Sequence, residues 1–139
     1  MSQPPVTPKQ LSVLFTKKLA ASNLTKVYKH LHLTTFTREQ AAALKVLPFA
    51  GFKIPYFDIH GKLTNFYRVR YLEDTRDEWT AKTSRKPLRY SQPPGTGVQL
   101  YIPPPALLDR KALGQSTMPL LITEGELKAA CACTYGFAT

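Results

Sequence analysis

Apolar residues near the start of the chain recur at helical spacing. They are Leu11, Leu14, Phe15 and Leu19. Steps of three and four residues place these side chains on one face of a helix. Thr7 can cap such a helix and Pro8 can take its first position. An amphipathic helix is therefore predicted from Pro8 to about Ser22.

Two weaker helical signals follow before residue 50. The apolar pattern continues less regularly from residue 24 to residue 33. Thr37 followed by Gln40 is a capping-box pattern, in which each side chain satisfies a backbone N–H of the other residue. The alanine-rich run 41–44 behind it predicts a short helix that ends before Pro48.

The period changes from helical to alternating at Gly51. Residues 54–59 and 63–71 are rich in β-branched and aromatic side chains, with a short turn signal between them. A β-hairpin is predicted. Alternate residues of a strand share a face, so Arg68 and Arg70 should project side by side from the second strand.

The segment after the hairpin predicts two more strands. Residues 73–85 are polar and are typical of a loop. Residues 86–92 and 98–102 have strand character, and the prolines and glycines at 93–97 indicate a turn between them. With the hairpin, these segments predict a small, mostly antiparallel sheet of four strands.

The final stretch of the chain indicates a strand followed by a helix. Residues 119–122 form an apolar run typical of a strand that is buried on both faces. Helix-forming residues continue from Glu126 until Gly136. Glu124 therefore stands after a strand, beside Gly125, which permits a sharp turn. A carboxylate in that place can hold a divalent metal or act as a general base. The alternative is an acid that the helix dipole favours, and this is the preferred interpretation of Glu126.

These patterns together predict an α+β fold with N-terminal helices, a small antiparallel sheet, and the first strand and helix of an α/β unit. The chain divides into three predicted segments. They are a helical leader at 1–50, an antiparallel β module at 51–105, and a unit at 106–139 that begins with a short linker helix over 106–114.

The charge balance points to a polyanionic partner. Nineteen Lys and Arg against nine Asp and Glu give a net charge of +10 in 139 residues. Such an excess supplies the salt-dependent, sequence-independent part of nucleic-acid binding. Cations with interleaved aromatic residues suit phosphate contacts and base stacking. The candidate nucleic-acid-binding residues are Arg68, Arg70, Arg85, Lys86, Arg89 and Tyr90. A solvated outer face and an acidic protein partner are the open alternatives.

Cellular location and cysteine chemistry are less informative. No apolar run approaches the length of a membrane span, and the first residues do not form a signal peptide, so a cytoplasmic location is expected. Cys131 and Cys133 are the only cysteines. Because residues two apart on a helix point to different faces, they are expected to be small core residues rather than a disulfide or a zinc site.

The apolar run, Glu124-Gly125 and the helix after them resemble the first motif of the Toprim fold. That fold is the catalytic domain of bacterial-type primases, topoisomerases and related nucleases. The longer string at 120–131 is similar, more narrowly, to Toprim-like primase-associated proteins of phages, plasmids and integrated mobile elements, which are often encoded beside a replicative helicase. Further blocks resemble the region that precedes the Toprim-like part of those proteins, at 51–62, 66–73, 86–90 and 100–104.

The resemblance implies that the intact parent protein is a DNA primase-like nucleotidyltransferase. In that family the Toprim glutamate is a general acid or base, and a downstream Asp-x-Asp pair binds Mg²⁺. Only Glu124 is matched here, as catalytic residue and metal ligand, with Gly125 as the turn at the site. Leu127 and Lys128 stand where bacterial primases often carry an acid, so priming itself is in question. One glutamate does not make a metal centre, and the 139 residues alone are expected to be inactive.

Two classes of function follow from the sequence. The first is the N-terminal portion of a mobile-element primase-like replication protein, which binds single-stranded DNA or RNA and contributes the first Toprim motif to metal-dependent phosphoryl transfer. It predicts a longer reading frame with two more acidic motifs. The second is a non-catalytic module that binds single-stranded nucleic acid, and a domain that docks on the helicase is a further alternative.

Overall fold

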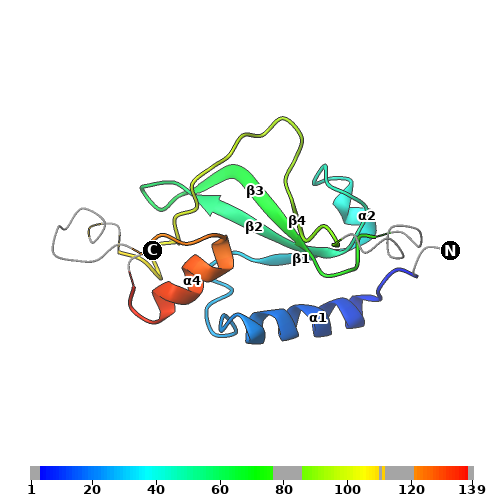
Figure 1. Ribbon diagram of the computed structural model, residues 1–139, viewed down its shortest axis with the longest axis horizontal. Helices are drawn as coiled ribbons and strands as arrows, with labels where there is room; N and C mark the ends of the chain where they lie inside the picture. The colour runs from blue at the N-terminus through cyan, green and yellow to red at the C-terminus, as the bar shows by residue number, and fades with distance from the viewer. Residues whose placement is uncertain (1–3, 77–85, 110, 112–120, 138–139) are drawn as a thin grey trace.

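The computed structural model describes residues 4–76, 86–109, 111 and 121–137. Its α-helices are α1 (Pro8–Ala21), α2 (Arg38–Ala41) and α4 (Glu126–Thr134). Its strands are β1 (Thr34–Phe36), β2 (Gly51–Phe57), β3 (Leu63–Tyr71) and β4 (Tyr90–Ser91). The strands form one antiparallel sheet in the order β1-β2-β3-β4 (Figure 1). The predicted α+β class is confirmed.

Helix α1 forms where the apolar spacing predicts it. Thr7 accepts a hydrogen bond from the Gln10 backbone N–H, the Gln10 side chain accepts one from the Thr7 N–H, and Pro8 opens the helix. The predicted capping box of Thr37 and Gln40 is present as well. It starts only the single turn of α2, because turns take over from residue 42. Residues 25–32 also form turns rather than a helix.

The predicted hairpin is confirmed as β2 and β3. Its register places Phe52 opposite Arg70 and Ile54 opposite Arg68, with an irregularity between Pro55 and Phe57. Gly51 lies where β2 meets β3 most closely. A Cβ atom added there would stand 2.1 Å from the backbone oxygen of Arg70, so this position accepts only glycine without a backbone shift.

The two strands predicted after the hairpin are largely wrong. Residues 98–102 are not in a strand, and the side chains of Val98 and Leu100 are 100% and 79% exposed. Prolines on both sides of this segment remove backbone donors, so a continuous ladder cannot extend into it. The strand predicted at 86–92 is reduced to Tyr90–Ser91. The fourth strand is instead β1, which comes from the predicted helical leader.

The strand predicted before Glu124 is not found in the described residues. Residues 119 and 120 lie outside them, while Leu121 and Ile122 are irregular and 42% and 83% exposed. A strand buried on both faces needs neighbours that pair its backbone groups, and no described strand lies beside this run. Helix α4 does begin at Glu126, as predicted. Of the predicted linker helix, residues 105–107 form a turn, and residues 110 and 112–114 lie outside the described part.

Helices α1 and α4 lie on the same side of the sheet (Figure 1). The hydrophobic cluster beneath them contains Leu19, Leu24, Leu31, Leu33, Phe52, Ile54, Leu127 and Ala130. It therefore includes residues from each of the three predicted segments. A second cluster contains Phe36, Ala41, Val69 and Tyr71, and α2 contributes to it. Because Val69 and Tyr71 alternate with Arg68 and Arg70 along β3, the second cluster lies on the opposite face of the sheet.

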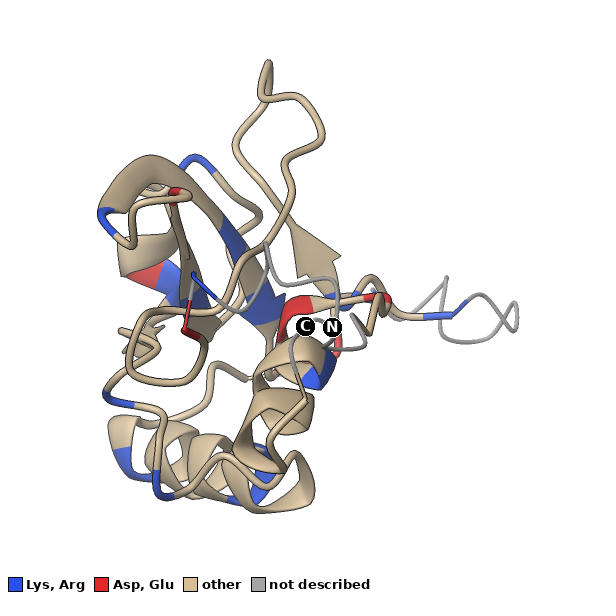
Figure 2. Ribbon diagram, turned by 90° about the vertical axis from the view of Figure 1, so that its left-hand side faces the viewer, with Lys and Arg blue, Asp and Glu red and all other residues tan. Residues whose placement is uncertain are grey.

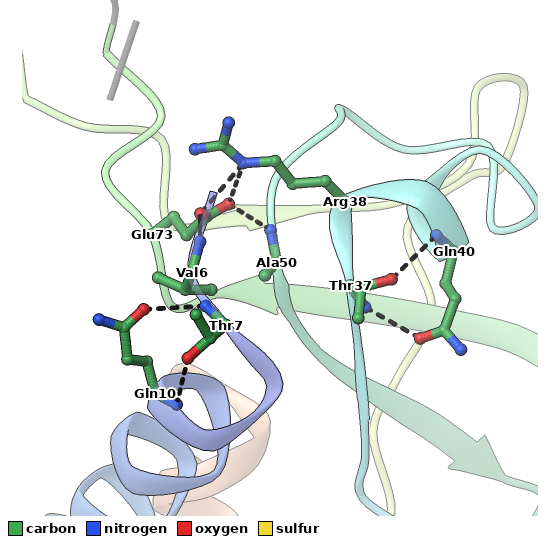
Figure 3. A network of polar contacts seen from close by, with 8 residues as sticks. All are labelled: Val6, Thr7, Gln10, Thr37, Arg38, Gln40, Ala50 and Glu73. Carbon is green, nitrogen blue, oxygen red and sulfur yellow. Dashed lines mark hydrogen bonds and ion pairs between the residues drawn. The ribbon is translucent and has the colours of Figure 1, made fainter. Parts of the chain in front are cut away.

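The carboxylate of Glu73 connects three separate segments of the chain beside the sheet (Figure 3). Glu73 accepts hydrogen bonds from the backbone N–H groups of Val6 and Ala50, at 3.1 and 2.6 Å, and from Arg38 Nε at 2.9 Å. Its side chain is only 4% exposed. Burial raises the pKa of Glu73, but these hydrogen bonds outweigh burial and hold that pKa below its usual value.

Candidate nucleic-acid interface

The two arginines of β3 project from the face that the helices cover. Arg68 pairs with Ile54 and Arg70 with Phe52, and residues directly opposite in an antiparallel ladder share a face. Ile54 and Phe52 belong to the cluster beneath α1 and α4. The arginines therefore do not lie on a solvated outer face. They remain half-buried at the edge of the helix layer, with the Arg68 side chain 32% exposed.

Tyr90 joins the two arginines into one group. It pairs with Arg70 in the β3–β4 ladder. Its ring centre lies 5.3 Å from Cζ of Arg68 and 5.2 Å from Cζ of Arg70, within the range of cation–π attraction. Three residues that the sequence proposed for nucleic-acid binding are thus assembled by pairing across the sheet.

Two hollows share Arg68 and Tyr90 of this group as a common wall. The larger, called the large hollow here, has a volume of about 640 Å³ and lies between the end of α1 and the start of α4. Its polar lining includes Lys18, Arg68, Tyr90, Glu124 and Lys128. The second, called the basic groove, has a volume of about 620 Å³ and is lined by Arg68, Lys86, Pro87, Leu88, Arg89 and Tyr90. Figure 2 shows basic positions along the sheet and on the helices packed beneath it. Arg85, also proposed from the sequence, lies outside the described residues.

Positive charge is concentrated at this wall. Burial lowers the pKa of Lys18, and the charges of Arg70 and Arg89 lower it further. Cations from α1, β3 and the segment before β4 are therefore close enough to repel one another. The Nε atoms of Arg68 and Arg70 are shielded from solvent and have no hydrogen-bond partner among the described residues. Two guanidinium donors of this group therefore have no acceptor among the described residues.

Glu126 is the buried counter-charge of Arg68. Its side chain is 2% exposed and its Oε1 accepts hydrogen bonds from the Tyr56 hydroxyl at 2.6 Å and from Arg68 Nη1 at 3.1 Å. Burial and the hydrogen bond to Glu126 raise the pKa of Tyr56. Glu126 Oε2 has no partner among the described residues. The interpretation of Glu126 as only a dipole partner is therefore incomplete, because this carboxylate ties α4 to the sheet.

Glu124 has a different environment from Glu126. It is exposed on the wall of the large hollow and forms no hydrogen bond or ion pair with the described residues. Gly125 follows as the N-cap of α4, with φ 89°, a conformation that disfavours side chains, and it provides no side-chain cap. The carboxylate thus stands just before a helix, as predicted, but not at the end of a strand.

The described residues do not fit a complete magnesium site. Mg²⁺ is bound through several oxygen ligands, of which carboxylates supply some. No group of three or more His, Cys, Asp or Glu residues that could hold a metal occurs in the described ranges. Glu126, the nearest acid along the chain, already binds Tyr56 and Arg68. Glu124 is left as a single oxygen ligand.

Four residues of this region escaped the sequence analysis or were assigned another role. They are Lys18, Tyr56, Glu126 and Lys128. Alternation along β2 puts Tyr56 on the same face as Ile54, so its inward direction was accessible from the sequence. The meeting of Lys18 with the arginines was not, because it depends on how α1 packs. Neither Cys131 nor Cys133 is in a disulfide, and Cys133 is buried beside Leu108.

No helix within the described ranges combines the length and apolar character needed to cross a membrane. Comparison of the chain with protein-family models, curated proteins and solved structures gives no match.

Proposed function

We propose that this chain binds single-stranded nucleic acid and forms the N-terminal portion of a mobile-element, DNA primase-like replication protein. The observation that carries the binding proposal is the group of Arg68, Arg70 and Tyr90, of which Arg68 and Tyr90 line both the large hollow and the basic groove. The proposed parent protein rests on the resemblance of the Glu124-Gly125 segment to the first Toprim motif.

The chemistry of this wall suits a flexible phosphate chain. Guanidinium groups bind phosphate oxygens in a fork, and lysines around the rim add charge without a fixed geometry. A half-buried tyrosine between them offers a ring on which a base can stack. Burial lowers the pKa of Lys18 and the charges of Arg70 and Arg89 lower it further, and a bound phosphate would offset that repulsion.

A catalytic role of Glu124 in the parent protein is the second part of the proposal. The supporting observation is that Glu124 is exposed on the wall of the large hollow and forms no ion pair with the described residues. Mg²⁺ would supply electrostatic stabilisation of phosphoryl transfer. Because the described residues offer only one suitable carboxylate, no step is assigned to this chain itself.

Fluorescence anisotropy with a labelled single strand over a range of salt concentrations tests the binding proposal. The double substitution Lys86→Ala and Arg89→Ala removes two exposed cations of the basic groove. The slope of log affinity against log salt should become shallower by about 1.4, since each phosphate contact to a single strand contributes about 0.7. The matched control is Lys26→Ala with Lys29→Ala, which removes two exposed lysines at the same spacing outside both hollows. Equal slopes for the two double variants would contradict the proposed surface.

Glu124→Gln separates the two parts of the proposal. Binding should persist or strengthen slightly, because the substitution removes a negative charge beside the phosphates. Loss of binding in this variant would show that the carboxylate itself contacts the strand. If the unsubstituted chain shows no affinity for single-stranded nucleic acid at low salt, the helicase-docking alternative is favoured.

A further inference from the structure

A third hollow shares Arg68, Gly125 and Glu126 with the large hollow. It has a volume of about 200 Å³ and is called the small pocket here. Its lining includes Tyr56, Arg68, Gln99, Tyr101 and Glu126. Pockets that hold drug-sized molecules are about 300–1,000 Å³, so this one suits a single ring system and not a whole nucleotide.

Glu126, which lines the small pocket, has one carboxylate oxygen that pairs with no described residue. Glu126 Oε1 is occupied by Tyr56 and Arg68, whereas Oε2 has no partner among the described residues and is shielded from solvent. A buried carboxylate oxygen without a donor costs free energy, so it favours any N–H group that reaches it. A phosphate is excluded as the occupant of this position, because two anions would repel each other.

The walls of the small pocket suit an aromatic ring. Tyr56 and Tyr101 stand edge to face, with ring centres 5.0 Å apart, and Phe66 packs on Tyr56 at 4.7 Å. The rim consists of Gln99 and Leu100, which are exposed and outside any strand. A ring can therefore enter from solvent without breaking a β-ladder.

We propose that the small pocket binds one base of the strand, and that Glu126 Oε2 selects bases carrying an amino group. This inference rests on the proposed function, since Arg68 lines both this pocket and the phosphate-binding hollows and so connects backbone and base. Glutamate accepts a hydrogen bond from the amino group of cytosine. Thymine presents a carbonyl oxygen in the same place, which the carboxylate repels.

Cytosine and thymine give the sharpest comparison, because both are single rings and only cytosine carries an amino group. They also differ at N3 and in the thymine methyl group, so a deoxycytidine strand with dimethylated amino groups is needed as a control. Short homopolymers of deoxycytidine and of deoxythymidine are compared by anisotropy at neutral pH. Binding of the deoxycytidine strand should be tighter by about tenfold, the effect of one hydrogen bond to a charged group. Glu126→Gln keeps the shape of the side chain but presents both a donor and an acceptor, so this variant should bind the two strands equally.

Two further measurements keep the inference testable if Glu126→Gln does not fold. A deoxycytidine strand with dimethylated amino groups lacks the N–H donors and should bind the unsubstituted chain no better than the deoxythymidine strand does. Lys86→Ala with Arg89→Ala should weaken both unmodified strands by the same factor. Equal affinity of the unsubstituted chain for the deoxycytidine and deoxythymidine strands would overturn the proposal of a base-selective pocket and leave the proposed function standing. Absence of binding to either strand would overturn both.

Discussion

Replacement of Glu73 by alanine is expected to be among the most destabilising substitutions that do not touch the proposed interface. The Glu73 side chain is 4% exposed and forms hydrogen bonds with Val6, Arg38 and Ala50, which belong to three separate segments. Its removal leaves the buried N–H of Ala50 without this acceptor and Arg38 without this carboxylate. Removing one partner of a buried ion pair costs about 3–5 kcal/mol.

The lower end of that range applies to Glu73→Ala. Arg38 keeps 21% of its side chain exposed, so water can hydrate part of the charge that is left behind. A loss of about 3 kcal/mol is a large share of the 5–15 kcal/mol by which ordinary domains are stable. For a chain of this length it corresponds to a fall of about 10 °C in the unfolding midpoint.

Thermal unfolding followed by circular dichroism measures this effect. Asp74→Asn is the matched control, because Asp74 is the neighbouring acid and also binds an arginine, Arg76, at 2.6 Å. Both partners of that pair are 29% exposed, and the residues are two apart in sequence. The control should change the midpoint far less, because both partners of this pair remain in contact with solvent and the pair joins residues only two apart. Equal midpoints for Glu73→Ala and Asp74→Asn would refute the reasoning from burial.

Three other predictions concern pH and packing. The folded-state pKa of Glu73 lies below its usual 4.5, so its contribution to stability is present above that pH and is lost as the pH falls through the folded pKa. In urea unfolding between neutral and acidic pH, the free energy of unfolding should therefore fall less steeply with pH in Glu73→Gln than in the unsubstituted chain. An equally steep fall in the two proteins would contradict this. Gly51→Ala forces a Cβ against the Arg70 backbone oxygen and should cost about 1–3 kcal/mol in urea unfolding, whereas Gly97→Ala, which meets open space, should not. Burial and the bond to Glu126 raise the pKa of Tyr56, so Tyr56→Phe should leave the tyrosinate absorbance change up to pH about 11 the same as in the parent chain.

The elements that the sequence predicted well are those specified by local signals. The α1 helix has its apolar spacing, capping box and proline within fifteen residues of one another, and the β2–β3 hairpin has two alternating runs around a short turn. Strand β1 was missed because its three residues have no pattern of their own and are defined by pairing with β2. Residues 98–102 show the converse error, since strand propensity there finds no partner strand.

In the candidate interface, too, the features set by local strand geometry were predicted and those set by packing were not. Arg68 and Arg70 share a face because of strand geometry, and the sequence predicted this correctly. The sequence did not predict that this face lies under helices. Glu126 was assigned to the helix dipole because its true partner, Tyr56, is 70 residues away in the chain. Contacts at that separation depend on how the elements pack, which local patterns do not encode.

The most direct test of the account is to map where a bound strand touches the protein. A single strand carrying iododeoxyuridine is cross-linked by light and the attached peptide is identified by mass spectrometry. The account predicts adducts at Tyr90. Tyr67 is an internal control, because it is also half-buried on the sheet beneath a cation, Lys53 at 4.5 Å, but projects from the opposite face. Adducts at Tyr67 without any at Tyr90 would contradict the proposed interface.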